Sequence, residues 1–455
     1  MSYSTVVDEL RQKDLELRAQ AFADGYNPGW PSVLLLPGGM GSRLIRSEVP
    51  YTPGVPFTNT RFYELWLDFA KALQGELQYI AMNAFGEDES GHPLVASGEL
   101  SSIVKKYDGV RAFFAGRANF AGLGYDWRRT PDKEFMYVRG FLRRIAEKVV
   151  ARGHADPRRR LTLYAHSQGG LVAKFFLNDV VERGENVTDW CERTITCCSP
   201  FYGTWSHLSR YYVGETLPNM VTGGAGRVSR IVASLKGPYI LLPAPKAVLA
   251  PRFAQLGLVR YPVRDAMNQG IECDPFNADT RPRLPAYVSD DYLVAARHQF
   301  TQIDAPLPAQ VADRVFHIRS NDVAGASIPF ELQWAANAGA GADPIGHNAG
   351  MHDGTVPFWA ARLASTPDAN VFDVQGVAHG GAAENSTVLD VVWKLMSNQP
   401  VLPGPQATAP GPHYAKHSEV EAELGEVQAG RRRPEDLLAL PADHFRTLVD
   451  GFSLS

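Results

Sequence analysis

The segment from Leu161 to Lys174 constrains the fold of this chain more than any other part of the sequence. It reads Leu-Thr-Leu-Tyr-Ala-His-Ser-Gln-Gly-Gly-Leu-Val-Ala-Lys, an apolar run followed by a glycine-rich turn and a second apolar stretch. This pattern is typical of a buried strand that turns sharply into a helix, with Ser167 at the turn. Ala165 and Gly169 stand two positions from the serine, where packing under the turn requires small residues. The segment predicts an α/β fold in which the Ser167 hydroxyl stands clear of the sheet.

Apolar runs alternate with helical spacings along much of the remaining chain. Strands that alternate with helices predict a mostly parallel sheet with helices on both faces. We expect strands at residues 32–36, 77–82, 161–165, 194–199, 314–318 and 371–374. We expect helices at residues 5–23, 62–73, 134–152, 168–183 and 387–396.

Residues 201–313 do not follow this alternation, because turns, prolines and aromatic residues replace the regular pattern. An insertion of this size between core strands predicts a cap or lid. The sequence therefore predicts a first core part at residues 1–200, a cap at 201–313 and a second core part at 314–399. Residues 400–455 are expected to form a proline-rich linker and a helical tail.

Charge and composition exclude several classes of protein. The chain has 45 basic and 49 acidic side chains and a formal charge of -4, so it lacks the basic excess of nucleic-acid-binding proteins. We find no apolar run long enough to cross a membrane and no apolar core of a secretion signal near the N-terminus. The four cysteines are too few for a disulfide framework, and their spacing fits no metal site. We expect a cytoplasmic protein without metal or cofactor.

Ser167 needs a base and an acid to act as a nucleophile, and in this fold the chain order is serine, acid, histidine. His379 is the best-placed base, because it lies in a glycine-rich turn between a predicted strand and a predicted helix. Two acids remain possible: Asp322 lies just beyond the strand at 314–318, and Asp353 precedes a Gly-Thr-Val sequence. Spacing alone does not separate them.

A transition-state oxyanion would need two backbone N–H donors. Gln168, directly after the serine, is expected to supply one of them. The glycine-rich loop Pro37-Gly-Gly-Met-Gly-Ser42 follows an early strand, and there Met40 is the expected second donor. We expect Gly39 in the same loop to contact the substrate.

Several sequence blocks resemble the lecithin:cholesterol acyltransferase family and its phospholipase and phospholipid:diacylglycerol acyltransferase relatives. The blocks are Leu34–Leu44, Gly124–Arg128, Ala165–Leu171, Leu241–Lys246 and Asp353–Val356. The resemblance implies an α/β-hydrolase fold with a large inserted cap, a Ser-Asp-His triad and acyl-ester substrates.

The resemblance also implies that Asp353 is the triad acid and that Asp126 and Arg128 form a structural pair in the pocket floor, where we expect Trp127 to contact the substrate. The chain departs from the family where Ala165 and His352 replace glycines.

Together, these observations predict a serine hydrolase or acyltransferase that acts on hydrophobic acyl esters. Ser167, His379 and Asp353 would form its triad, and water or an alcohol would accept the acyl group. The alternative is a ligand-binding protein that keeps the same scaffold without catalysis. In either case the expected partners are small hydrophobic molecules rather than nucleic acid.

Overall fold

A computed structural model gives the fold. It describes residues 2–53, 61–66, 68, 71, 75–100, 106–204, 207–208, 211, 225–253, 263–264, 270–271, 274–277, 284–321, 331–333, 346–348, 352–401, 417–429, 431–441, 443–445 and 448.

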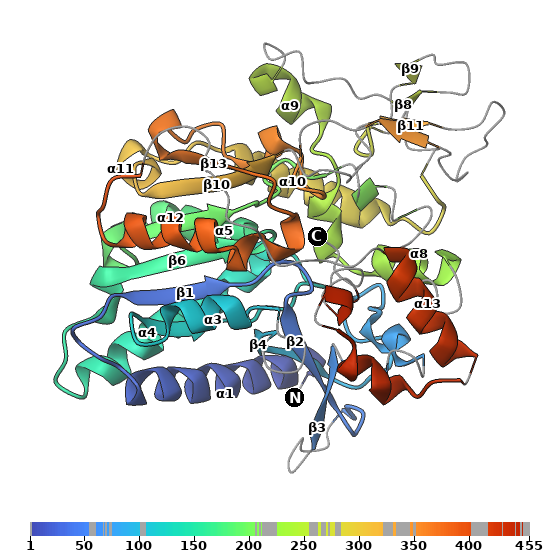
Figure 1. The fold of residues 1–455 in the computed structure, drawn as a ribbon, viewed down its shortest axis with the longest axis horizontal. Helices are drawn as coiled ribbons and strands as arrows, with labels where there is room; N and C mark the ends of the chain where they lie inside the picture. Colours follow the sequence, from blue (N-terminus) through green and yellow to red (C-terminus); the bar gives the residue numbers. More distant parts are fainter. Residues whose placement is uncertain are drawn as a thin grey trace.

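A six-stranded sheet forms the centre of the molecule (Figure 1), with the spatial order β13-β10-β7-β6-β1-β5 and every neighbouring pair parallel. The strands are β1 (Ser32–Leu36), β5 (Asn119–Gly122), β6 (Leu161–His166), β7 (Arg193–Cys197), β10 (Val315–Asn321) and β13 (Val371–Gln375). The chain builds outward from β1 to β5 and then returns to place β6 on the other side of β1. Open α/β sheets bind ligands at such a reversal of strand order, beyond the carboxyl ends of the strands.

Helices cover both faces of this sheet, as the sequence predicts. Side chains of β1 alternate between two apolar clusters, with Leu34 and Leu36 on one face and Val33 and Leu35 on the other. The first face packs against α1 (Tyr3–Asp24), α4 (Pro131–Val150), α5 (Gly169–Glu182) and α10 (Asp290–Asp304). The second packs against α3 (Asp108–Phe114) and α12 (Ser386–Met396).

A small antiparallel sheet, which the sequence does not predict, joins β2 (Ser42–Ser47), β3 (Phe62–Trp66) and β4 (Leu94–Glu99). The helix predicted at 62–73 is wrong for its first five residues, which form β3. Pairing with β2 outweighs the helical spacing there, and the Trp66 indole N–H donates to the Met40 carbonyl at 2.7 Å. The strand predicted at 77–82 is also wrong, because the 3-10 helix η1 (Glu76–Ile80) occupies most of it. Its buried residues Leu77 and Ile80 are three apart, which matches the 3-10 repeat.

The region between β7 and β10 contains α8 (Ala225–Ser234), η4 (Gly237–Leu241), α9 (Lys246–Phe253), α10 and α11 (Ala309–Ala312). Its short strands β8 (Val263–Arg264) and β9 (Gly270–Ile271) form a sheet with β11 (Glu331–Gln333) and β12 (Gly346–Asn348). In Figure 1 the strands of the parallel sheet point to the right, toward the side where α8 and this small sheet lie. The division into core and cap stays a prediction.

The remaining elements are short, apart from one helix near the C-terminus. They are η2 (Pro157–Arg160), η3 (Val187–Asp189), η7 (Phe358–Ala361), η8 (Asp368–Asn370), η9 (His379–Glu384), α13 (His417–Gln428) and η10 (Pro434–Ala439). Most of the predicted proline-rich linker lies outside the described residues. None of the helices in the described part of the chain combines the length and apolarity that a membrane span needs.

Candidate active site

Ser167 occupies a strained turn between β6 and α5. Its φ angle is 51°, in the left-handed region that residues other than glycine avoid. Such a conformation costs on the order of 1–3 kcal/mol and is found mainly at functional sites. The Ser167 N–H donates to the Cys197 carbonyl at 2.9 Å, which continues the pairing of β6 with β7 through the turn. The turn therefore projects the serine side chain beyond the carboxyl end of β6.

The two glycines after the turn allow the close approach of neighbouring segments. A Cβ atom on Gly169 would lie 2.5 Å from the carbonyl oxygens of Leu36 and Pro37. A Cβ atom on Gly170 would lie 2.1 Å from the Ser199 hydroxyl oxygen. The requirement for glycine at 169 therefore comes from the end of β1, rather than from the packing against Ala165 that the sequence suggests.

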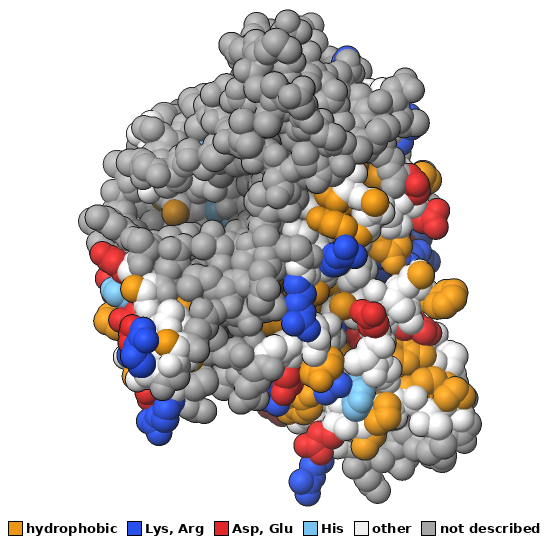
Figure 2. All heavy atoms as spheres, turned by 90° about the vertical axis from the view of Figure 1, so that its right-hand side faces the viewer, with side chains coloured by type: hydrophobic (Ala, Val, Ile, Leu, Met, Phe, Trp, Pro, Cys, Tyr) orange, Lys and Arg blue, Asp and Glu red, His pale blue; other side chains and the backbone are white. Residues whose placement is uncertain are grey.

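The three predicted triad side chains form one hydrogen-bonded chain. The His379 Nε2 atom lies 2.9 Å from the Ser167 hydroxyl oxygen, and its Nδ1 atom lies 2.7 Å from Asp353 Oδ2. His379 begins η9, just beyond the carboxyl end of β13. All three side chains are nearly inaccessible, with the His379 residue 2% exposed. Figure 2 looks onto the side of the molecule toward which the strands of the parallel sheet point.

Backbone groups hold the Asp353 carboxylate in place. Its Oδ1 atom accepts hydrogen bonds from the N–H groups of Thr355 at 2.9 Å and Val356 at 2.7 Å. The Asp353 carbonyl accepts the His379 N–H at 2.7 Å, so backbone and side chain both join the two segments. Two donors on Oδ1 leave Oδ2 oriented toward the imidazole. The other acid that spacing left open, Asp322, lies outside the described residues.

The predicted oxyanion loop lies against the serine turn. Met40 has a φ angle of 58°. A Cβ atom on Gly39 would come within 2.7 Å of Gln168 Oε1, and one on Gly38 within 3.0 Å of the Ser167 Cβ. The Gln168 Nε2 atom is buried without a hydrogen-bond partner among the described residues, so a ligand beside Gly39 could accept from it. The roles of Met40, Gln168 and Gly39 toward a substrate stay predictions.

The sequence prediction omits three residues near the predicted triad: Tyr107, His166 and Cys198. The pKa of the Cys198 thiol lies well above its ordinary value because of a hydrogen bond to Cys197, burial and the nearby Asp353 carboxylate. Among the described residues, Cys198, Asp353 and His379 form the one group spaced for metal ligation, with ligand atoms within 4.8 Å of one another. The Asp353–His379 hydrogen bond already uses two of those atoms, so we assign no metal there.

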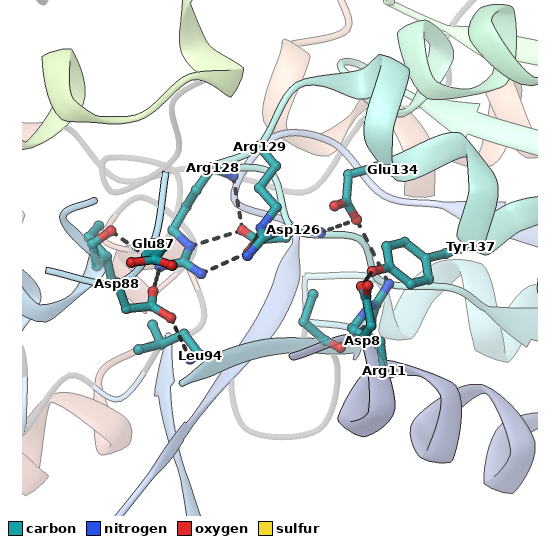
Figure 3. Close-up of polar contacts among 12 residues, drawn as sticks. Asp8, Arg11, Glu87, Asp88, Leu94, Asp126, Arg128, Arg129, Glu134 and Tyr137 are labelled. Atoms are coloured by element: carbon teal, nitrogen blue, oxygen red, sulfur yellow. Dashed lines mark hydrogen bonds and ion pairs between the residues drawn. The ribbon is translucent and has the colours of Figure 1, made fainter. Parts of the chain in front are cut away.

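The block Gly124–Arg128 contains the expected Asp–Arg pair (Figure 3). Arg128 donates to both oxygens of Asp126, at 2.9 and 2.7 Å, and also contacts Asp88. Burial alone would raise the pKa of Asp126, but the Arg128 guanidinium holds it below its ordinary value. Trp127 is 1% exposed and packs edge-on against Trp66, with ring centroids 5.4 Å apart. Its predicted contact with substrate stays a prediction.

The parallel sheet, the strand-turn-helix at Ser167 and the order of the hydrogen-bonded side chains define an α/β-hydrolase fold. Residues 112–302 match the model of the lecithin:cholesterol acyltransferase family, which confirms the resemblance over that part of the chain. Together the family match and the fold support an enzyme of the acyl-ester hydrolase or acyltransferase type.

Solved structures are similar to this chain at low sequence identity. A chain in the crystal structure of the Tle4-Tli4 complex has a TM-score of 0.50 and 13% identity, over 82% of this chain and 99% of that one. The mature lipase BlEst2 of Bacillus licheniformis has a TM-score of 0.35 and 13% identity, over 81% of this chain and 93% of its own. No curated protein matches the sequence.

Proposed function

We propose that this protein cleaves acyl esters with Ser167 as nucleophile and passes the acyl group to water or to an alcohol. The observation that carries the proposal is the buried chain of hydrogen bonds from Ser167 through His379 to Asp353. A hydroxyl, an imidazole and a carboxylate in this order are the groups that acyl transfer requires. The match to an acyltransferase family and the absence of basic excess favour ester substrates over nucleic acid.

In the first half-reaction the Ser167 hydroxyl gives its proton to His379 Nε2 while its oxygen attacks the ester carbonyl. The carbonyl oxygen becomes an oxyanion, which the N–H groups of Met40 and Gln168 stabilise. Asp353 holds the imidazolium through Nδ1. His379 then returns the proton to the departing alcohol as the carbon–oxygen bond breaks, which leaves an acyl group on Ser167.

In the second half-reaction water or an alcohol gives a proton to His379 and attacks the acyl-enzyme. His379 returns that proton to the Ser167 oxygen as the acyl–serine bond breaks, which leaves the free serine and either a carboxylic acid or a new ester. The acceptor is decided by how well the site excludes water and orients the alcohol. Product analysis with a hydrophobic alcohol added to the assay separates the two outcomes, since only a transferase gives the new ester in excess.

The decisive test is Ser167→Ala. We expect hydrolysis of a short-chain nitrophenyl ester to fall by on the order of a thousandfold or more, and labelling by a fluorophosphonate probe to disappear. Ser167→Gly serves as a matched variant, because glycine accepts the positive φ without strain. It should be as inactive as Ser167→Ala and at least as stable to heat.

Full labelling of either variant would contradict the proposal. A native protein that forms no adduct, but whose melting temperature rises with an added acyl ester, would instead be the ligand-binding protein that the sequence leaves as the alternative.

A further inference from the structure

A second buried chain of hydrogen bonds links Gly38 to the backbone of His379. The Tyr107 hydroxyl accepts the Gly38 N–H at 2.8 Å and lies 3.1 Å from the Nδ1 atom of His166. The Nε2 atom of His166 lies 3.0 Å from the backbone carbonyl of His379. Tyr107 is 1% exposed and His166 is 0% exposed, so water does not compete for these contacts.

Hydrogen-bonding capacity fixes the direction of every link. A carbonyl oxygen only accepts hydrogen bonds, so His166 Nε2 must carry a hydrogen and donate a hydrogen bond to the His379 carbonyl. Burial, together with electrostatic repulsion from Lys106, lowers the pKa of His166 well below its ordinary value, so the ring is neutral. Its Nδ1 atom is then an acceptor, which the Tyr107 hydroxyl satisfies as donor while receiving the Gly38 N–H. The chain therefore runs Gly38 to Tyr107 to His166 to His379.

The two ends of this chain are the two parts of the site that must stay aligned with Ser167. Gly38 begins the loop that contains Met40, the predicted oxyanion donor. His379 supplies the predicted base, and its own carbonyl receives the other end. The loop packs closely against these partners. A Cβ atom on Gly41 would lie only 2.8 Å from the Tyr107 hydroxyl oxygen. A Cβ atom on Gly38 would lie 3.0 Å from His166 Nδ1.

We propose that Tyr107 and His166 are positioning residues that hold the oxyanion loop and the His379 backbone in register with the nucleophile. Neither side chain needs to touch the substrate. The inference rests on the proposed function, since register matters only if Ser167, His379 and the loop act on one carbonyl group. Small displacements of such groups are costly, because proton transfer and oxyanion stabilisation both depend on short distances.

The first test is Tyr107→Phe, which removes the hydroxyl and keeps the ring. We expect kcat for a nitrophenyl ester to fall about ten- to hundredfold with little change in KM, because the loss affects the transition state rather than substrate binding. Rates are expressed per active site titrated with the fluorophosphonate probe. This normalisation removes any loss that comes from partial unfolding.

The Ki of a boronic acid inhibitor distinguishes a positioning role from a merely structural one. Its tetrahedral adduct on Ser167 places an oxygen where the oxyanion forms, so its Ki should rise in proportion to the loss in kcat/KM. The matched control is Tyr164→Phe. Tyr164 is equally buried, and its hydroxyl donates to the Ala383 carbonyl in the same η9 segment at 2.8 Å, but no described contact links it to the loop. This variant should keep both kcat and Ki.

His166→Asn tests whether the two residues act as one chain. Asparagine can still accept from Tyr107 but is too short to reach the His379 carbonyl, so kcat should fall as it does in Tyr107→Phe. The double variant should lose little more than either single variant, because each change breaks the same chain. Fully additive losses, or a Tyr107→Phe protein with native kcat and Ki per titrated site, would overturn the inference. A native protein that the probe does not label would instead refute the proposed function itself.

Discussion

Three residues at the candidate site adopt backbone conformations that residues other than glycine avoid. Ser167, Met40 and Cys198 have φ angles of 51°, 58° and 52°. Within the described residues, Asn398 is the remaining non-glycine residue with a positive φ angle. Strain of this kind persists only where the surrounding structure enforces it, and it gathers at functional sites. Its concentration on the predicted nucleophile, the predicted oxyanion loop and a neighbour of the predicted triad acid is independent support for the location of the site.

Asp353→Asn tests the role of the carboxylate at the level of a single residue. The asparagine oxygen can still accept from Thr355 and Val356, so the fold should survive. Its NH2 group would then face His379 Nδ1 and favour the wrong imidazole tautomer. We expect kcat/KM for a nitrophenyl ester to fall by on the order of 10³–10⁴, while circular dichroism and melting temperature stay close to native.

Asp322→Asn is the matched control, since Asp322 is the other acid that the sequence left open. It should retain native activity. If Asp322→Asn were inactive and Asp353→Asn active, the triad acid would have to be reassigned.

The elements nearest the site could be predicted from the sequence because local signals determine them. The apolar run of β1 is ended by a proline and two glycines, and β6 and α5 are divided by a glycine-rich turn. By contrast, β3 depends on pairing with β2, and η1 depends on a preceding Gly75 with a φ angle of 84°. Neither signal is visible in apolar spacing, so the sequence assigned the wrong structure to both.

The same distinction separates the site residues that could be predicted from those that could not. Ser167 and His379 lie in glycine-rich turns at strand ends, and the resemblance selects Asp353. Tyr107 and His166 carry no such local signal, because their contacts join positions 59 and 213 residues apart in the chain. Only the folded structure brings these partners together.

At the level of whole elements, a buried lysine joins α10 to the core helix α5. Lys174 donates through Nζ to the carbonyls of Ala305 at 3.0 Å and Gln302 at 3.4 Å, at the end of α10. A positive charge there also complements the negative end of the helix dipole. Burial lowers the pKa of Lys174 to about 8, despite the opposing effects of Asp304 and Glu182. Lys174 Nζ also donates to Asn178 Oδ1, one turn further along α5.

We expect Lys174→Met to lower the free energy of unfolding by about 1–3 kcal/mol, because it removes the hydrogen bonds from Nζ to the end of α10, although Asn178 Nδ2 still donates to the Gln302 carbonyl. Hydrogen exchange should accelerate in peptides from the end of α10. Lys394→Met is the control, since Lys394 lies on α12 in a more exposed ion pair with Asp390. That substitution should change stability by less than about 1 kcal/mol. Unchanged exchange in α10 would show that other contacts hold the two helices together.

Across the whole molecule, buried charges join segments that are far apart in the sequence (Figure 3). Arg11 from α1 donates to the Gly124 carbonyl at 2.8 Å and lies 3.9 Å from a carboxylate oxygen of Glu134 on α4. The same carboxylate oxygen accepts the Asp126 N–H at 2.9 Å. Arg128 in turn joins Asp126 to Asp88, which precedes β4. The removal of one member of such a network is costly, because it leaves another charge buried without a partner.

Glu134 makes the stability of this network depend on pH. Burial, with the charge of Asp126, raises its pKa to about 7, although Arg11 and Arg129 oppose the shift. The folded protein therefore binds a proton that the unfolded chain releases at lower pH. This contribution to stability is complete below the ordinary pKa of about 4.5 and is lost as pH rises through about 7. Over that range it should change the free energy of unfolding by up to about 1.4 kcal/mol per pH unit.

Glu134→Gln removes the titrating group and keeps an oxygen that can accept the Asp126 N–H. Denaturant titrations between pH 5 and 8 should therefore show the variant gaining stability relative to the native protein as pH rises. Glu147→Gln is the control, because Glu147 lies on the same helix with its side chain 65% exposed. Its stability difference from the native protein should stay constant with pH. Parallel pH curves for native protein and Glu134→Gln would mean that Glu134 is already ionised in the folded state, held by Arg11 and Arg129 strongly enough to cancel the effect of burial.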